Sequence, residues 1–585
     1  MSSYLLFAVG ILTIIGVYAL LTMSLNLKFG ITGLIDLGVV GYFAVGAYTY
    51  VLLTAAPPGE SGQTYAIGLG LPLWVGFIAA PIAAGVFSFI IGLPALRLRG
   101  EYLAIATYAG AEVVAAIAAN EDWLTNGVRG YSNLSQPLRS VVESGNSYQY
   151  VFLALLAVAV AAVYWLLTRM EIRPLGRAFR AVRESEEVAL SVGKNVARYR
   201  MKAFVIGGMI SGLAGCFYVS YFTLVVPTMF AAEVTWTAWI ALVIGGSGNY
   251  RGVILGTAIL LAAQEATRFF QASADMASLL AASRLVAMGV LLVVIIRLRP
   301  RGSWASGRKR IRHWWGTDVS GTGRDMEIPL LETYEVSKHF GGLKAVNGCT
   351  LRVPRGSIIG LIGPNGAGKT TLFNVIAGFL EPTSGRVALD GEDITGVPSW
   401  ARVKKGVART FQTPHGFPEI TVYENLMVAP VNQAGEGLFG SIMWPKQAKK
   451  QEKVLRARVL DLLERLGMSD YRNTLVCNLA AGDARVIEFA RQVMLDPKLL
   501  LLDEPAAGIN PAITDSLIRL LRELREEGLT LLVIDHNLSF MMRLCDSIYV
   551  MARGTIISEG TPDEVARDPR VIEAYLGTAH ESSEA

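Results

Sequence analysis

The most informative stretch of the sequence is Gly363-Pro-Asn-Gly-Ala-Gly-Lys-Thr-Thr371. It follows an apolar, strand-like run, Ser357–Ile362, and precedes a helix-like stretch, Leu372–Phe379. In this context glycines let backbone N–H groups face phosphate oxygens, and the helix N-terminus adds positive potential. We therefore expect a phosphate-binding loop in which Lys369 reaches the terminal phosphates and Thr370 ligates Mg²⁺. Its members are Gly363, Pro364, Asn365, Gly366, Ala367, Gly368, Lys369, Thr370 and Thr371.

Further along the chain, polar side chains follow apolar strand-like runs. A run of four leucines ends at Asp503 and Glu504. Asp503 is predicted to hold Mg²⁺, and Glu504 to act as general base on the attacking water. His536 follows another apolar run and is predicted to hydrogen-bond a γ-phosphate, whereas Gln412 is expected on a loop that senses Mg²⁺ and water. The alternatives are a solvated histidine at a strand end and a surface glutamine.

In order and spacing, these elements resemble an ATP-binding-cassette ATPase over about residues 329–577. Within that superfamily, residues 340–346, 502–511 and 571–577 are most similar to the ATP-binding subunit of bacterial branched-chain amino-acid importers. The resemblance implies an α/β P-loop domain with a helical subdomain around residues 430–495. It also implies that Phe340 stacks on adenine, with a core phenylalanine as the alternative.

The first half of the chain has a different composition. Only 31 of residues 1–296 are charged, against 70 of the remaining 289. Because 52% of all residues are hydrophobic, the sequence is not that of a disordered chain. A net charge of +5 does not indicate a nucleic-acid partner, and the four scattered cysteines indicate neither a disulfide framework nor a zinc ribbon.

Long apolar runs predict a polytopic α-helical membrane domain with eight or nine spans. The first run is too long for a signal-peptide core, so we expect a retained span. The basic loop 169–202 is expected inside and the N-terminus outside. The seventh run is too short to span upright, and its neighbour Gly245-Gly-Ser-Gly248 would mark a broken or re-entrant element. The runs are 4–27, 31–55, 69–95, 102–119, 149–168, 203–226, 235–247, 252–267 and 280–297.

A few polar residues interrupt these runs. Asp36, Glu112, Gln264 and Glu265 lie within or near spans, where charge is costly and often functional. The alternative is that Asp36 lies at the membrane interface and that the others face packed helices or water. Lys28 follows the first run and contributes to the positive charge expected inside.

The membrane half resembles the permease subunit of the same importers over about residues 1–300. The similarity rests on Ser24–Leu27, Gly33–Gly38, Gly46–Thr49 and the segment 173–193. By this resemblance, Glu186-Glu187-Val-Ala and Gly193 form the coupling helix that docks on the ATPase; the alternative is a basic topogenic loop.

The chain thus resembles a permease fused to an ATPase. Its expected divisions are a transmembrane domain 1–298, a linker 299–328, an ATPase domain 329–577 and a tail 578–585. The linker carries arginines among tryptophans and is expected either on the anionic inner leaflet or as a flexible tether.

The resemblance implies ATP-driven import of branched-chain or related small amino acids across the bacterial inner membrane, with a cytoplasmic ATPase domain and ATP and Mg²⁺ as cofactors. Expected partners are a second permease subunit, a second ABC ATPase subunit, an extracytoplasmic substrate-binding protein and membrane lipid, with no nucleic acid. Importers of urea, short amides or small carboxylates are an alternative, and so is an ATP-gated, non-pumping channel or sensor. An exporter ranks last because the docking-loop similarity is to importers.

One element departs from the family pattern. The signature, which normally contains Leu-Ser-x-Gly-Gln, is here Leu479-Ala-Ala-Gly-Asp483. Ala480 removes a hydroxyl that would contact the γ-phosphate, and Asp483 places an anion nearby. A homodimer would carry this change in both ATP sites, whereas a heterodimer would pair the intact Walker A, Glu504 and His536 with a partner's signature. We therefore favour a heterodimer.

Overall fold

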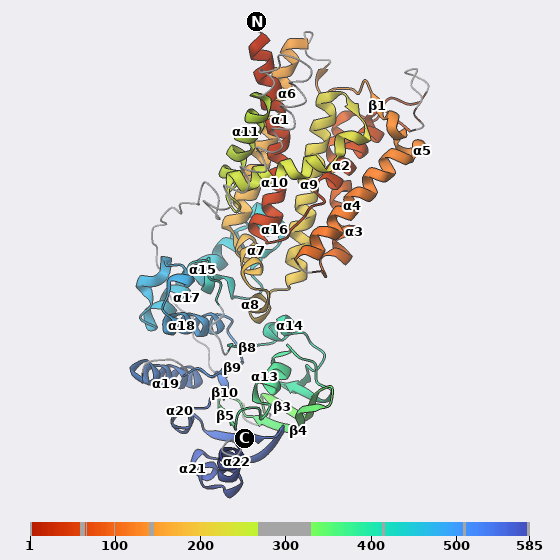
Figure 1. Ribbon diagram of the computed structural model, residues 1–585. Coiled ribbons are helices and arrows are strands. Elements are labelled where there is room, and N and C mark those ends of the chain that lie inside the picture. Colours follow the sequence, from red (N-terminus) through yellow and green to blue (C-terminus); the bar gives the residue numbers. More distant parts are fainter. Residues whose placement is uncertain are drawn as a thin grey trace. The chain divides into compact units, whose positions relative to one another are not determined.

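The computed structural model describes residues 3–58, 65, 67–98, 100–139, 145–266, 329–411, 416–506 and 511–581. The chain divides into two compact units, residues 1–183 with 197–312 and residues 184–196 with 313–585. Figure 1 shows helices in the first unit and a mixture of strands and helices in the second. The predicted linker 299–328 and the last apolar run, 280–297, lie outside the described residues.

The first unit is helical, as predicted, and each of the eight apolar runs within the described residues contains a helix. Six helices in this part of the chain are long and apolar enough to cross a membrane, so the predicted number of eight or nine spans is not confirmed. The helices are α1 (Ser3–Leu25), α2 (Val39–Thr54), α3 (Leu73–Ala95), α4 (Glu101–Asn120), α5 (Asp122–Thr125), α6 (Gly145–Ile172), α7 (Pro174–Glu184), α9 (Val196–Phe222), α10 (Ala232–Gly245) and α11 (Tyr250–Ala266). Two short strands, β1 (Tyr131–Ser132) and β2 (Leu224–Val225), pair antiparallel.

The second and seventh runs differ from their predicted form. A π-helical turn, Asn26–Ile31, continues α1, and Gly33 has a φ of +73°. The helix α2 therefore starts only at Val39, and its 16 residues rise about 24 Å, less than the roughly 30 Å of a bilayer core. The seventh run is longer than predicted because the 3₁₀ turn Pro227–Phe230 precedes α10, which makes an apolar segment of 19 residues.

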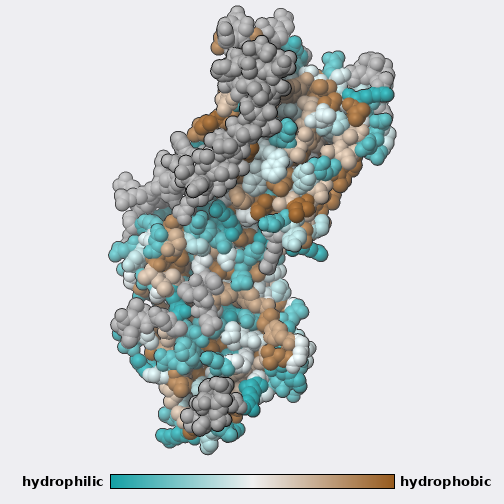
Figure 2. All heavy atoms as spheres, viewed as in Figure 1, coloured by the Kyte–Doolittle hydropathy of each residue, from teal (hydrophilic) through white to brown (hydrophobic). Residues whose placement is uncertain are grey.

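Large apolar side chains point outward from α3 and α4. Trp74, Ile78, Tyr102 and Ile105 are all more than half exposed. Figure 2 shows hydrophobic side chains on the visible surface over these helices. Backbone polar groups within a helix are bonded to one another, so such a surface suits hydrocarbon.

The second unit contains a six-stranded sheet in the order β12-β11-β5-β10-β9-β8 and a four-stranded sheet in the order β4-β3-β6-β7. The strands β11, β5, β10, β9 and β8 are mutually parallel, and β12 closes one edge antiparallel. The strands are β3 (Leu331–Phe340), β4 (Leu343–Val353), β5 (Ile358–Ile362), β6 (Ser384–Leu389), β7 (Glu392–Asp393), β8 (Val407–Arg409), β9 (Leu499–Asp503), β10 (Thr530–Ile534), β11 (Ser547–Ala552) and β12 (Thr555–Gly560).

Helices cover these sheets and form the predicted helical subdomain. They are α13 (Lys369–Ala377), α14 (Ser399–Lys404), α15 (Val422–Val428), α16 (Leu438–Met443), α17 (Lys446–Arg465), α18 (Ala481–Val493), α19 (Pro511–Glu526), α20 (Leu538–Leu544), α21 (Pro562–Arg567) and α22 (Pro569–Glu581). The helix α22 continues past Gly577, where the tail was expected to begin.

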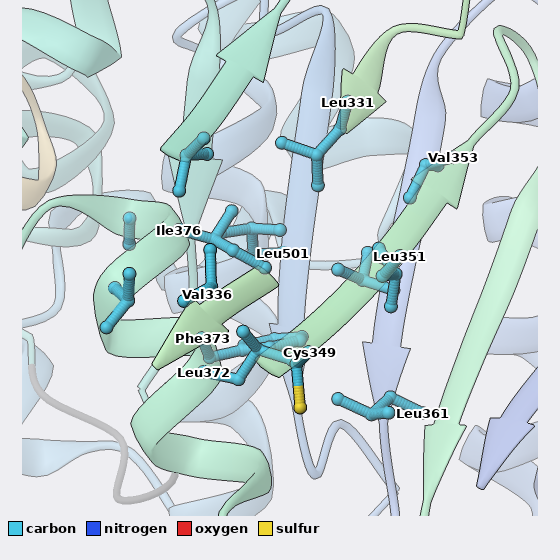
Figure 3. Close-up of a cluster of buried hydrophobic side chains, with 14 of the residues drawn as sticks. Leu331, Val336, Cys349, Leu351, Val353, Leu361, Leu372, Phe373, Ile376 and Leu501 are labelled. Carbon is cyan, nitrogen blue, oxygen red and sulfur yellow. The ribbon is translucent and has the colours of Figure 1, made fainter. Parts of the chain in front are cut away.

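The core of this unit lies between the two sheets and α13. Every residue of β5, β9 and β10 is buried, which explains why these strands have apolar runs without alternation. Figure 3 shows Leu351 and Val336 of the antiparallel sheet, Leu361 and Leu501 of the parallel sheet, and Phe373 of α13 in one cluster. This packing holds α13 against the end of β5, where the phosphate-binding loop lies.

Candidate nucleotide site and docking segment

The predicted catalytic elements meet at one edge of the parallel sheet. Leu361 of β5 is level with Ile534 of β10, and Ile534 is level with Asp503 of β9. Because the three strands are parallel, the segments that follow them emerge at the same edge. The structure thereby brings together the loop 363–371, the carboxylates 503–504 and His536.

The loop 363–371 has the backbone that its glycines predict. Gly363 and Gly368 have φ angles of +151° and +99°. A Cβ at Gly363 would lie 2.0 Å from the Met551 carbonyl oxygen, and a Cβ at Gly368 would lie 2.1 Å from the Ala345 carbonyl oxygen. Gly368 is also the N-cap of α13, whose first residue is Lys369. The chain can therefore turn sharply only with glycine here, and the N–H groups of the first helical turn face the loop.

Lys369 lies folded against its own loop. Its Nζ donates to the carbonyl oxygens of Gly363, at 2.7 Å, and Pro364, at 2.9 Å. Burial lowers the pKa of Lys369, and the nearby carboxylates of Glu504 and Asp503 oppose this shift. A phosphate group in the loop would offer the ammonium a charged acceptor in place of two neutral ones, and such hydrogen bonds are stronger.

Asp503 is held by the segment before the predicted glutamine loop. Its Oδ2 accepts a hydrogen bond from Arg409 Nη2 at 3.1 Å, and its backbone N–H donates to Thr410 Oγ1 at 3.1 Å. Burial raises the pKa of Asp503 while Arg409 opposes the shift; burial also lowers the pKa of Arg409. An aspartate carboxylate here and the Thr370 hydroxyl at the start of α13 are hard oxygen donors, which suit Mg²⁺.

Glu504 and His536 face each other. Glu504 has a φ of +49°, and its backbone N–H donates to the Ile534 carbonyl at 2.7 Å. His536 Nδ1 lies 3.5 Å from Glu504 Oε1, and the histidine is mostly exposed. Buried Asp535 accepts the N–H groups of Ala506 and Asn537 through its two carboxylate oxygens. This links the segment after Glu504 to the loop that carries His536.

The other predicted nucleotide contacts are Phe340, Gln412 and the signature residues Ala480 and Asp483, and the structure describes all of them except Gln412. The Phe340 ring, at the end of β3, is 47% exposed and is not a core side chain, which leaves it accessible for stacking. Gln412 lies outside the described residues, although Arg409–Phe411 before it are described. Ala480 is the N-cap of α18 and provides no side-chain cap, and Asp483 lies in the first turn. The buried Glu488 of α18 accepts the Phe411 N–H at 2.8 Å, which ties the signature helix to the glutamine loop.

The segment 184–196 belongs to the second unit and packs on its surface. It contains α8 (Glu186–Ser191), which contacts α14. Gly193 has a φ of +72°, and a Cβ there would lie 3.1 Å from Val403 and 3.2 Å from Val431.

Polar contacts fix both ends of this docking segment. Lys194 is 2% exposed; its Nζ donates to the Pro430 carbonyl at 3.0 Å and forms an ion pair with Glu436. Glu184 accepts the Glu419 N–H at 2.9 Å. The structure therefore places the predicted coupling helix against the ATPase fold.

Three protein-family profiles match the chain. Residues 7–295 match the branched-chain amino acid transport system permease component, residues 346–507 match the ABC transporter family, and residues 555–581 match the branched-chain amino acid ATP-binding cassette transporter. The high-affinity branched-chain amino acid transport ATP-binding protein LivG of Escherichia coli K12 is 42% identical over 255 residues, which are 43% of this chain and all of that protein. The chain belongs to the branched-chain amino-acid ABC transporter family. It is a permease fused to an ABC ATPase, as predicted.

Other relatives of this transporter are similar over the same half. BraF of Pseudomonas aeruginosa is 40% identical over 255 residues, 43% of this chain and all of that protein. A nucleotide-free ATP-binding cassette from an ABC transporter is 36% identical and covers 42% of this chain and 99% of its own, with a TM-score of 0.38. A second cassette of an ABC transporter, solved in its ADP conformation, is 35% identical in sequence. The similarity covers 43% of this chain and 100% of that one, with a TM-score of 0.37. The match to the ABC transporter family and the similarity to LivG show that an ATP-binding, ATP-hydrolysing domain occupies the second half of the transporter.

The permease half contains a charged site that the sequence argument missed. Lys28 was expected to be part of the positive charge inside, but it is fully buried, with Nζ 2.6 Å from Asp36 Oδ2. Asp36 is equally buried within the protein, and its Oδ1 accepts the Gly38 N–H at 2.8 Å. The ammonium also lies 4.0 Å from the centroid of the Tyr42 ring and 4.8 Å from that of Phe204.

Sequence reasoning also missed Arg409, Asp535 and Lys194. Arg409 and Asp535 adjoin predicted motifs, and a charged residue inside or directly after an apolar strand is a usable signal. Lys194 had no such signal, because its partner Glu436 lies more than 200 residues away in the sequence.

Proposed function

We propose that this transporter imports branched-chain or related small amino acids across the bacterial inner membrane, with ATP hydrolysed on the cytoplasmic side. The observation that carries the proposal is the docking segment 184–196. It belongs to the permease sequence, yet Glu184, Gly193 and Lys194 contact the ATPase fold. A movement of the ATPase would therefore act directly on the segment that connects two candidate membrane spans, α6 and α9.

The roles of the site residues follow from their positions. The loop 363–371 binds the phosphates of ATP, Lys369 neutralises the terminal ones and Phe340 stacks on adenine. Thr370, Asp503 and Gln412 hold Mg²⁺, which supplies charge neutralisation at the phosphates when bound. Glu504 takes a proton from the attacking water, and His536, beside it, hydrogen-bonds the γ-phosphate.

Uptake of labelled leucine tests the proposal. The chain would be reconstituted in liposomes with its partner subunits, a substrate-binding protein and internal ATP. We expect leucine to accumulate above the external concentration. The Lys369→Ala variant should lose this accumulation. The control variant Lys405→Ala should keep it, because Lys405 pairs with Glu392 at the surface. Lack of leucine accumulation by an assembled, ATP-hydrolysing complex would overturn the amino-acid assignment. Urea, short amides and small carboxylates would then be tested as competitors.

Glu504→Gln separates a pump from an ATP-gated channel. The variant keeps the loop 363–371 and its affinity for ATP but lacks the general base. In a pump it abolishes accumulation. A channel opened by ATP binding would still let leucine equilibrate down its gradient in this variant.

We also propose that the working assembly contains a second permease and a second, different ATPase subunit, with a separate extracytoplasmic binding protein. The support is the signature, because Ala480, the N-cap of α18, provides no side-chain hydroxyl. A lost hydrogen bond to a charged phosphate costs about 1.5–3 kcal/mol. Steady hydrolysis by this chain alone, at the rate of the complete complex, would contradict the heterodimer.

A further inference from the structure

Beside the docking segment, α16 carries apolar side chains that the second unit leaves uncovered. Phe439 and Met443 are 82% and 76% exposed, and Leu438 is also exposed. Ser441, whose hydroxyl donates to the Leu438 carbonyl of the same helix at 2.9 Å, is fully buried, so the opposite side of the helix faces the unit. The helix therefore presents one apolar side outward.

The next helix adds a basic stripe. Lys446, Lys449, Lys450 and Lys453 are exposed in the first two turns of α17. Their spacing of three, four and seven residues puts them on one face of the helix. Within the described residues, none of the four forms an ion pair, so their charge is available to a partner.

Chain connectivity limits how far this surface can lie from Val196, where α9 begins. Glu436 pairs with Lys194, and Lys194 is two residues before Val196, the first residue of α9. Two residues span at most about 7 Å. The 27 residues of α9 rise about 40 Å, whereas a bilayer core is roughly 30 Å thick. Its first turns carry Arg198, Arg200 and Lys202, so the end at Val196 suits the headgroup layer. Phe439 follows Glu436 by three residues, at most about 10 Å of chain.

We propose that α16 and the lysine face of α17 bind the surface of the anionic leaflet, with Phe439 and Met443 among the lipid headgroups. Apolar side chains next to a lysine stripe are the features of an interfacial membrane contact. A protein partner is less suited because lysine is depleted in the cores of protein interfaces. The contact goes beyond the proposed function and does not depend on which substrate is carried.

Lipid-borne quenchers test this contact in the full transporter. Cys216, Cys349 and Cys545 are buried, so Cys477→Ser leaves no exposed cysteine among the four. In that background Phe439→Cys or Met443→Cys is labelled with a fluorophore and placed in nanodiscs of phosphatidylglycerol that contain headgroup spin-labelled lipid. Ile572→Cys is the matched control, since Ile572 is 45% exposed on α22, which carries none of the predicted nucleotide-binding residues. Retained ATP hydrolysis confirms that each labelled protein is folded.

We expect the spin-labelled lipid to quench the labels at 439 and 443 at least threefold more than the label at 572. Replacing the four lysines with glutamine should reduce that quenching in phosphatidylglycerol and have little effect in phosphatidylcholine. Quenching of the 439 label by aqueous iodide alone would overturn the proposal, because the helix would then face solvent. Protection from both quenchers would overturn it in favour of a protein contact, such as the second permease subunit.

Discussion

Both units bury an ion pair, and the two pairs have different surroundings. Lys28 and Asp36 are fully buried, and aromatic rings and a backbone N–H surround them. Arg409 and Asp503 are 6% and 2% exposed, but Asp503 begins the catalytic edge of the sheet, next to Glu504. The first carboxylate has its partners within the fold, whereas the second is also predicted to serve a bound ion. The comparison teaches that burial alone does not separate a structural charge from a functional one.

The largest effect is expected in the permease pair. Lys28→Met leaves the Asp36 carboxylate buried without its counter-ion, which should cost about 3–5 kcal/mol of stability. The double variant Lys28→Met/Asp36→Leu should recover most of this loss, because no buried charge remains. Thermal unfolding of the chain in nanodiscs measures both. A double variant as unstable as the single one would show that the pair stabilises this unit by more than mutual neutralisation.

In the ATPase pair, stability and activity should separate. Arg409→Met should destabilise the chain by about 3 kcal/mol, since Asp503 loses its buried partner. Adding Asp503→Leu should restore the unfolding temperature but leave ATP hydrolysis absent, because the predicted Mg²⁺ ligand is gone. Calorimetry and a phosphate-release assay would measure the two readouts on the same samples. A double variant that still hydrolyses ATP would refute the assigned role of Asp503.

The difference between the two units also explains which features could be predicted from the sequence alone. The loop 363–371, Asp503, Glu504 and His536 follow their strands directly, so local order predicted both the fold and the site. In the permease, apolar side chains occur on every helical face, and periodicity does not distinguish Lys28 from a residue of the positive inner loops. The predicted start of the second run, residue 31, was wrong because Gly33–Gly38 contains apolar residues but is not helical, with Gly33 at a φ of +73°. Lys194 could not be predicted because its partners lie in the other half of the sequence.

The docking pair is an intermediate case, since Lys194 is buried but Glu436 is 15% exposed. Lys194→Met should cost about 2 kcal/mol, because the glutamate retains some water. It should also reduce leucine uptake more than ATP hydrolysis, since the docking segment loses two polar contacts. Measuring both rates in liposomes gives the coupling ratio. Lys405→Met is the control, and equal losses of uptake and hydrolysis would contradict a coupling role.

If ATP binding changes the protonation of Lys369, the affinity for ATP should depend on pH. Burial places the pKa of Lys369 below 10.5, and bound phosphates would raise it again. Below the lowered pKa the lysine is charged in both states, so ATP affinity should not vary with pH through this group. Above it, binding must take up a proton, and affinity should fall by up to about tenfold per pH unit. Titration calorimetry measures this.

Two variants sharpen the pH experiment. Glu504→Gln should move the onset to lower pH, because the carboxylate supports the charged lysine. Lys369→Arg should bind ATP more weakly but remove the fall, since arginine stays charged. An unchanged pH profile in Lys369→Arg would show that another group titrates.

The smallest effect concerns a position without any charge pair. Ala480 has extended backbone angles at the N-cap of α18, so Ala480→Ser should cap the helix and stabilise the chain by about 1 kcal/mol. If the missing hydroxyl also limits hydrolysis, the rate for this chain alone should rise about tenfold or more. Ala480→Gly, which adds no hydroxyl, is the control for the rate only, because glycine is itself favoured over alanine at an N-cap. A higher unfolding temperature with an unchanged rate would mean that the signature alanine affects the helix and not the chemistry, and the preference for a heterodimer would then lose its support.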